Sequence, residues 1–195
     1  MAEKKYTPMM QHYLKMKEEN PDSILFYRLG DFYEMFFEDA KLVSQELDLV
    51  LTGRSAGVEE KVPMCGIPFH AANSYIQRLV KKGYKVAICE QLEDPSSAKG
   101  LVDRGIIKII TPGTYMDATM DAKSTNYMAS CDVSSFEITV IYCELSTGEL
   151  KYQTLQRSLV ALQKALLEQN VSELVCPMTM DKKWMAALEE MDTMI

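Results

Sequence analysis

The segment 30–37 (GDFYEMFF) places four aromatic side chains and one carboxylate directly after a turn-forming pair of residues. Gly30 and Asp31 break an apolar run, as turn residues do, and Phe32 and Glu34 follow within three residues. An aromatic ring at the tip of such a turn, with an acid two residues on, presents a flat apolar face beside a hydrogen-bond acceptor. The plain alternative is a core strand or helix start whose aromatic rings are buried. The residues alone leave both interpretations open.

A second pair of residues has the chemistry of a nucleophile and its base. Cys65 and His70 lie five residues apart, and a thiol beside an imidazole can act in covalent catalysis, but no third residue is marked to orient the histidine. We therefore interpret Cys65 as a buried thiol in a proline-rich turn and His70 as a capping or packing residue at a helix start. Two His and five scattered Cys show no zinc-ligand spacing.

Carboxylates that could hold two divalent metal ions, as in a nuclease, are sparse in the second half of the chain. Asp132 lies on an expected strand, and the other candidates are Glu168, at the far end of a helix, and Glu173, near the start of a strand. We expect Asp132 to be structural or exposed. The sequence contains no G-x-x-x-x-G-K-[ST] and no G-x-G-x-x-G. We therefore expect the chain itself not to be an enzyme.

The charge balance excludes a protein that coats nucleic acid by charge alone. The chain has 21 Lys and Arg against 28 Asp and Glu, a net charge of −7, whereas such a coat needs excess cations. Residues 1–115 have 15 cations and 16 acids, a net of −1, and residues 116–195 have 6 and 12, a net of −6. This shift indicates a domain boundary. Five cysteines without a C-x-x-C pair, and no signal peptide or apolar membrane-length run, predict a cytoplasmic protein.

Helix and strand patterns alternate across residues 1–115, which predicts an α/β domain with a mixed central sheet and flanking helices. Thr7 and Pro8 suit the N-cap and first position of a helix. The segment 62–70 has two prolines and one glycine and is predicted to be too broken for a regular element. The expected helices are 8–20, 36–47 and 71–82, the expected strands are 24–29, 49–52, 84–89 and 106–110, and the expected loops are 53–61 and 93–100.

A different pattern follows residues 116–125, which lack large apolar side chains other than methionine and are interpreted as a linker. Three strands joined by short turns, then a helix, a strand and a helix, match the start of a ribonuclease-H-like domain at residues 126–195. The chain ends at Ile195 before such a domain closes, so we expect a fragment of a longer protein. The expected strands are 127–133, 136–145, 149–155 and 174–176, and the expected helices are 158–169 and 182–191.

Five stretches of the chain are distinctive: TPMMQHYL, PDSILFYRLGDFYEMFFEDA, VPMCGIPFHAA, KVAICEQLEDPSSAKGLVDR and IIKIITPGT. In this order and spacing they resemble the N-terminal part of the MutS family of DNA mismatch repair proteins. The resemblance covers essentially all of residues 6–115 and continues more weakly through 126–195. It implies a mismatch-recognition domain at residues 1–115, a linker at 116–125 and a truncated connector domain at 126–195. The Phe-x-Glu motif of the family is present as Phe32-Tyr33-Glu34.

The resemblance implies that Phe32 enters the minor groove of duplex DNA and stacks on a mispaired or unpaired base, where the duplex kinks. Insertion of an apolar wedge costs a few kcal/mol of unstacking per base step, and less where a mismatch or small loop has already lost stacking. Glu34 would be repelled by the phosphates of correct DNA and would hydrogen-bond a base edge that turns toward it. Discrimination would then depend on the deformability of the duplex rather than on its sequence.

Four cations are candidate phosphate contacts by position: Arg54, Lys99, Arg104 and Lys108. Arg54 follows an expected strand end, and the other three lie in or near the segment that ends with the expected strand 106–110. Each has a plain alternative as a solvated surface residue.

By resemblance, the complete protein is an ATPase that uses ATP and Mg, forms a homodimer and recruits a MutL-like protein through the connector domain. The chain itself is expected to need no cofactor, to bind mismatched double-stranded DNA and to contact no membrane. A cytoplasmic, nucleoid-associated location follows from the same resemblance. The alternative is a protein-interaction module in which the acidic region 116–195 binds a partner without direct DNA contact.

Overall fold

The computed structural model describes residues 6–93, 102–116, 125–191 and 193–195. Contacts between Cα atoms divide the chain into two compact units, residues 1–110 and 111–195. Both units combine sheets with helices, so the α/β class is confirmed. Loop 93–100 and linker 116–125 lie largely outside the described residues.

The first unit contains α1 (Pro8–Glu19), β1 (Ser23–Leu29), β2 (Phe32–Phe36), α2 (Phe37–Leu47), β3 (Thr52–Arg54), β4 (Val62–Pro68), the 3₁₀ helix η1 (Phe69–Ala71), α3 (Ala72–Val80), β5 (Lys85–Gln91) and β6 (Arg104–Ile110).

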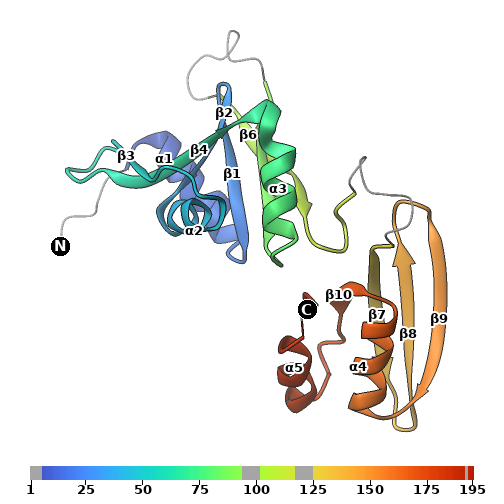
Figure 1. Cartoon of the computed structure of the whole chain (residues 1–195). Coiled ribbons are helices and arrows are strands. Elements are labelled where there is room, and N and C mark those ends of the chain that lie inside the picture. Colours follow the sequence, from blue (N-terminus) through green and yellow to red (C-terminus); the bar gives the residue numbers. More distant parts are fainter. Residues whose placement is uncertain (1–5, 94–101, 117–124, 192) are drawn as a thin grey trace. The chain divides into compact units, whose positions relative to one another are not determined.

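The sheet of the first unit has the strand order β3-β4-β2-β1-β5-β6 (Figure 1). β1 and β5 run parallel and the other neighbours antiparallel. Helix α1 packs on the face that carries Leu25 and Tyr27 of β1. Helix α2 packs against β2 and β4 on the other face, where the Cys65 thiol donates to the Ala40 carbonyl. The sheet is thus covered by helices on both faces, which explains the buried apolar run of β1.

A buried carboxylate, Asp39, joins the first helix, the central strand and the second helix. It accepts hydrogen bonds from the Leu25 backbone N–H at 2.9 Å and from the Tyr13 hydroxyl at 3.4 Å. It also pairs with the Lys17 ammonium at 2.9 Å. Because Asp39 lies just past the end of β2, its carboxylate gives the Leu25 N–H the acceptor that a neighbouring strand would otherwise supply.

The prediction that segment 62–70 is irregular is wrong, because most of it forms β4. This strand pairs with β2 over Met64–Pro68 and with β3 over Val62–Met64. Pro63 therefore lies beyond the end of the pairing with β2, and Pro68 lies beyond the end of the pairing with β3. Each proline thus stands where one neighbouring strand is missing, and its lack of an N–H leaves the ladder intact.

The strand expected at 49–52 is also displaced, since β3 begins only at Thr52. Helix α2 ends at Leu47, and its C-cap residue Asp48 has a left-handed backbone with φ of 55°. The Leu49 N–H then donates to the Ser44 carbonyl, and the Ser44 hydroxyl donates to the Leu49 carbonyl. Residue 49 is thereby bound to the end of the helix, and Val50 is exposed rather than paired in a strand.

The second unit has the β-β-β-α-β-α order expected from the sequence, and its assignment to a ribonuclease-H-like domain stays a prediction. Its sheet has the order β10-β7-β8-β9, with β10 parallel to β7. Leu162, Leu166 and Leu188 join one core cluster, so both helices cover the same face. No helix in the described residues is long and apolar enough to span a membrane. The elements are β7 (Tyr127–Val133), β8 (Glu137–Glu144), β9 (Glu149–Gln156), α4 (Leu159–Glu168), β10 (Val171–Val175) and α5 (Lys182–Glu189).

The division between the units falls five residues before the boundary expected at residue 115. The Glu173 carboxylate of β10 accepts hydrogen bonds from the Thr111 hydroxyl and, at 3.0 Å, from the Gly113 N–H. The Asn126 side chain donates to the Pro112 carbonyl at 2.8 Å. The turn after β6 is therefore held by the second unit.

Substitution of Asp39 tests its role in joining three elements of the first unit. Asp39→Ala leaves the buried Leu25 N–H without its acceptor and should lower the free energy of unfolding by about 2–3 kcal/mol. Glu38→Ala, at the exposed neighbouring position, should change it by less than about 0.5 kcal/mol. Urea denaturation followed by circular dichroism measures both. Equal effects at the two positions would contradict the role of Asp39.

Candidate nucleic-acid interface

A two-residue turn connects β1 to β2 at one end of the sheet (Figure 1). Leu29 pairs with Phe32 across it, which leaves Gly30 and Asp31 as the loop. Gly30 has φ of +59°, and a two-residue hairpin loop that begins with such a glycine matches the type II′ turn favoured between antiparallel strands. A Cβ added at Gly30 would meet no atom within 4 Å. The backbone conformation, rather than lack of space, therefore calls for glycine.

The aromatic residues after this turn differ in exposure. Phe32 is 46% exposed, whereas Tyr33 and Phe36 are buried and Phe37 is half-buried. The two interpretations of the segment thus apply to different residues. Most of its rings build the core, and the ring next to the turn stands at the surface.

Glu34 lies on the same face of β2 as Phe32, because side chains two residues apart share a face of a strand. Its carboxylate forms an ion pair with the Arg54 guanidinium of β3. The side chains of Glu34 and Arg54 are 15% and 35% exposed, and the Arg54 guanidinium lies 5.9 Å from the centre of the Phe36 ring. The structure thus brings together three of the residues singled out from the sequence: Phe32, Glu34 and Arg54.

Gly66 of β4 leaves space for the side chains of Glu34 and Arg54 to meet. β4 lies between β3 and β2, so the Arg54 side chain must cross it to meet Glu34. The residue of β4 opposite Glu34 is Gly66, where a Cβ would lie 3.4 Å from the Glu34 Cγ. A larger side chain at Gly66 would occupy the space above β4 that the ion pair uses.

Arg104 differs from the exposed phosphate contact expected from the sequence. It is buried, and its guanidinium donates to the carbonyls of Arg28 and Val102, both at 2.8 Å. The same guanidinium lies 5.3 Å from the centre of the Tyr27 ring. These contacts are those of a residue that supports the sheet from inside the unit.

The two remaining candidate cations do not join the group of Phe32 and Glu34. Lys108 is exposed and pairs with Ile88, next to a register shift between Ile88 and Cys89 in the pairing of β5 with β6. Because Cys89 shares a face with Tyr27 and Glu34, its neighbour Ile88 and therefore Lys108 lie on the opposite face of the sheet. Lys99 lies outside the described residues.

Near the β1–β2 turn, Arg28 contacts both Glu90 and Phe69. None of these three residues was singled out from the sequence. Arg28 pairs with Glu90 at 3.2 Å, and its guanidinium lies 3.7 Å from the centre of the Phe69 ring. One signal was present in the sequence, since Arg28 ends a buried apolar strand immediately before the turn. A charge at such a place needs a partner.

The structure removes the basis for a thiol nucleophile at Cys65. The thiol is buried and donates to the Ala40 carbonyl at 3.4 Å, and burial raises its pKa to about 12. His70 lies exposed on η1. The interpretation of Cys65 as a buried thiol is confirmed, although its segment is a strand rather than a turn. All five cysteines are free: Cys65, Cys89 and Cys131 are buried, and Cys143 and Cys176 are half-buried.

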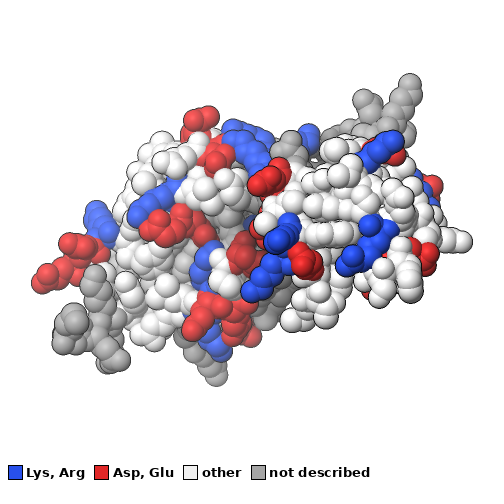
Figure 2. Space-filling view, turned by 90° about the horizontal axis from the view of Figure 1, so that it is seen from below, with Lys and Arg blue, Asp and Glu red and all other residues white. Residues whose placement is uncertain are grey.

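Positive and negative side chains are interspersed on the face of the molecule shown in Figure 2. Figure 2 shows Lys and Arg beside Asp and Glu on the face in view, separated by uncharged residues and without a broad area of one sign. Such a surface agrees with the net charge and gives little general attraction to a polyanion.

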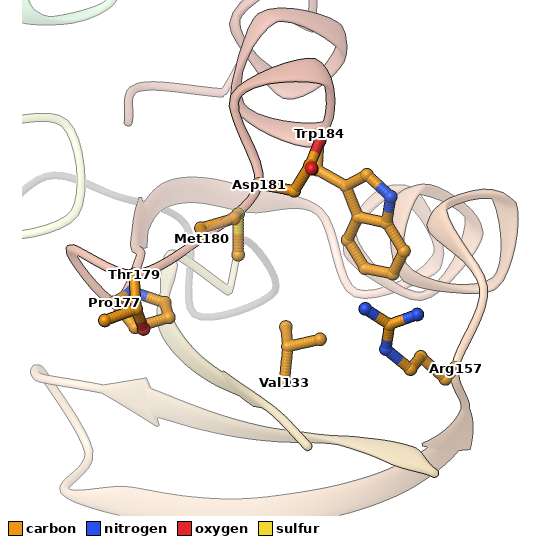
Figure 3. A pocket seen from close by; sticks show the side chains of 7 residues that line it. All are labelled: Val133, Arg157, Pro177, Thr179, Met180, Asp181 and Trp184. Carbon is orange, nitrogen blue, oxygen red and sulfur yellow. The ribbon is translucent and has the colours of Figure 1, made fainter. Parts of the chain in front are cut away.

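A pocket in the second unit lies near the ends of β7 and β9 and the start of α5 (Figure 3). The Arg157 guanidinium lies 5.6 Å from the centre of the Trp184 ring and donates to the Ser134 carbonyl at 3.0 Å. Asp181 lines the same pocket and caps α5 by accepting from the Lys183 N–H.

This pocket does not offer the carboxylates of a two-metal nuclease. Asp132 is exposed on β7, and the described residues include no group of three His, Cys, Asp or Glu placed to hold a metal ion. The pocket combines one cation, one aromatic ring and one capping carboxylate.

Comparison with known proteins identifies relatives of the chain. Residues 7–119 match the family model of MutS domain I. Over 177 residues, 86% of the chain, it is 54% identical to the DNA mismatch repair protein MutS of Clostridium botulinum (strain Loch Maree / Type A3). Over 146 residues, 74% of the chain, it is 58% identical to the protein of the same name from Clostridium tetani (strain Massachusetts / E88). The chain spans 19% and 17% of the length of these two relatives.

The raised pKa of Cys65 predicts that its thiol resists alkylation, because the thiolate is the reactive form. At pH 8 we expect iodoacetamide to label Cys65 more slowly than the half-buried Cys143 in the folded chain, as measured by mass spectrometry of peptides. In urea the two rates should become similar. Equal rates in the folded chain would show that Cys65 is an accessible thiolate.

Proposed function

The chain belongs to the MutS domain I family, and on that premise we propose that its first unit recognises mispaired and unpaired bases in duplex DNA during mismatch repair. One observation carries the proposal. Phe32 stands exposed beside a two-residue turn, and Glu34 lies two residues further on the same face. The pair offers an apolar ring to stack on a base and a carboxylate to accept a hydrogen bond from its edge.

Phe32 acts as a wedge in this proposal. Separating two stacked base pairs costs a few kcal/mol, and stacking of a base on an aromatic side chain returns about 1–3 kcal/mol. On matched DNA the two terms roughly cancel. At a mispair or an unpaired base the cost is lower, so insertion becomes favourable there and the kinked complex forms.

The ion pair with Arg54 changes the expected role of Glu34. A lone carboxylate would repel the phosphates of every duplex, but here Arg54 offsets its charge while the DNA is absent. A partly exposed ion pair contributes only about 0–1 kcal/mol, so Glu34 and Arg54 can exchange partners at little cost. At a mispair Glu34 binds the base edge, and Arg54 becomes free to bind a phosphate.

The remaining functions are proposals for the longer protein, since its relatives are about five times the length of this chain. By family membership we propose a cytoplasmic ATPase that uses ATP and Mg and acts as a homodimer. The second unit, with its acidic balance and its pocket at Arg157 and Trp184, is the candidate contact for a MutL-like protein. The second candidate function is that of a protein-interaction module without DNA contact.

Removal of the Phe32 ring tests the wedge. Phe32→Ala should lower the affinity of the chain for a G·T duplex at least tenfold, which corresponds to about 1.4 kcal/mol, and bring it to the level for matched DNA. Fluorescence anisotropy titration with labelled duplexes measures both affinities. Phe136→Ala, the same change at an exposed position of the second unit, is the control and should have no effect. Unchanged affinity of Phe32→Ala would contradict the wedge and favour the interaction module.

The affinity of the chain alone is a separate expectation. Because the chain spans about a fifth of the length of its relatives, we expect it to bind mismatched DNA more weakly than the whole protein. Nanomolar binding by this chain in the same titration would contradict that expectation.

Substitution of the charged pair tests the discrimination. Glu34→Gln should narrow the gap between mismatched and matched DNA mainly because matched DNA binds more tightly, by about threefold to tenfold. Arg54→Gln leaves Glu34 unpaired and should weaken the binding of matched DNA instead. Titrations at two salt concentrations measure both changes, which should shrink at higher salt. A flat affinity of Glu34→Gln for matched DNA would refute the repulsion argument.

A further inference from the structure

Both carbonyl groups of the β1–β2 turn are bound by two residues, Arg28 and Phe69, whose side chains are stacked. The Arg28 Nε donates to the Gly30 carbonyl, and the Phe69 backbone N–H donates to the Asp31 carbonyl at 2.9 Å. The Arg28 guanidinium and the Phe69 ring are themselves stacked, with 3.7 Å between the guanidinium carbon and the ring centre. The loop that precedes Phe32 is therefore bound at both of its residues.

The stacked pair is fixed in turn by Glu90 of β5. Glu90 forms the ion pair with Arg28 and also accepts a hydrogen bond from the Tyr33 hydroxyl. The side chains of Arg28 and Glu90 are only 15% and 23% exposed. Burial raises the pKa of Tyr33 to about 12, so its hydroxyl remains a donor at neutral pH. The Arg28 carbonyl accepts from the guanidinium of Arg104 at 2.8 Å, which holds the strand itself.

The side chains of Arg28 and Tyr33 lie on the face of the sheet opposite the exposed ring of Phe32. Arg28 pairs with Tyr33 across the hairpin, whereas Leu29 pairs with Phe32. Because side chains alternate along a strand, Arg28 and Tyr33 point to one face of the sheet, and Phe32 and Glu34 point to the other. Arg28 therefore acts on Phe32 through the turn and not through contact with the ring.

We propose that Arg28 is a positioning residue for mismatch recognition, which fixes the turn at Gly30 and Asp31 through Phe69 and Glu90. The inference rests on the proposed function. Phe32 can separate stacked bases only if the turn that precedes it stays in place. A mobile turn would lose conformational entropy when DNA binds, which would weaken the binding. Two residues at the tip of a hairpin have few neighbours of their own. The contacts of Arg28 and Phe69 order Gly30 and Asp31 before DNA binds.

The charge on Arg28 is not itself available to DNA. Its guanidinium is mostly buried, is stacked on Phe69 and is engaged by the Gly30 carbonyl and the Glu90 carboxylate. A lysine at this position would keep the positive charge and the attraction to Glu90. It would lose the planar group that stacks on a ring and binds two acceptors at once. The Arg28→Lys variant therefore separates geometry from charge.

The first test measures order at the turn without any DNA. Backbone ¹⁵N relaxation of the whole chain gives order parameters for Gly30, Asp31 and Phe32, which we expect to be near 0.85 in the original chain and below about 0.6 in Arg28→Lys and Phe69→Leu. Phe69→Tyr keeps an aromatic face and should retain the original values. Arg78→Lys makes the same chemical change at an exposed position of α3 and is the control. Unchanged order in Arg28→Lys and Phe69→Leu would overturn the proposal.

The second test measures DNA binding by the same variants. Arg28→Lys and Phe69→Leu should reduce the ratio of affinities for G·T and matched duplexes at least fivefold, while Phe69→Tyr keeps it and the melting temperature of all variants stays within a few degrees. A role confined to general stability predicts the reverse: a lower melting temperature with an unchanged ratio. A mobile turn with an unchanged ratio would also overturn the proposal. Failure of the proposed function would appear separately, as an unchanged affinity of Phe32→Ala for the G·T duplex. In that case the relaxation measurement alone would still test whether Arg28 orders the turn.

Discussion

The register of β1 and β2 at the two-residue turn is the constraint on which the candidate interface depends. Tyr27 and Phe36 are buried against α1, and this burial decides which face of the hairpin turns inward. A slip of one residue would move every side chain of β2 to the other face. With the register fixed, Phe32 and Glu34 continue the same face beyond the core, where the sheet reaches the surface. The positions of Phe32 and Glu34 are therefore set by buried residues of the core.

Two arginines balance the charges on the two faces of this hairpin. Arg54 pairs with Glu34 on the face of Phe32, and Arg28 pairs with Glu90 on the other face. Charges near the turn are thus largely compensated within the unit, which agrees with the net of −1 over residues 1–115. Such a surface gains little from the general attraction between cations and phosphates. Its selectivity would instead come from the energy of deforming the duplex, and the ion pair at Glu34 would limit repulsion until a base edge replaces it.

The order and type of most elements could be predicted from the sequence, because apolar spacing and turn residues are local signals. Segment 62–70 could not, since the prolines of β4 are tolerated only where β2 or β3 is absent, and that depends on strand order. The same applies to the site. Phe32 and Glu34 lie two residues apart in the sequence and carry a recognisable motif, whereas the pairing of Glu34 with Arg54 requires β4 between their strands and Gly66 beneath the contact. The buried position of Arg104 and the stack of Arg28 on Phe69 likewise arise from tertiary packing, which residue type and spacing do not encode.

Photochemical cross-linking from residue 32 reports directly where this residue lies in the complex with DNA. A photoreactive phenylalanine would replace Phe32 in the whole chain, which is then irradiated with duplexes that contain one G·T pair or one unpaired base at a known position. Insertion of Phe32 at the mispair predicts cross-links concentrated at the mispaired or unpaired base and its immediate neighbours, with a much lower yield on matched DNA. Cross-links spread evenly along the duplex, or an equal yield on matched DNA, would contradict insertion of Phe32 at the mispair.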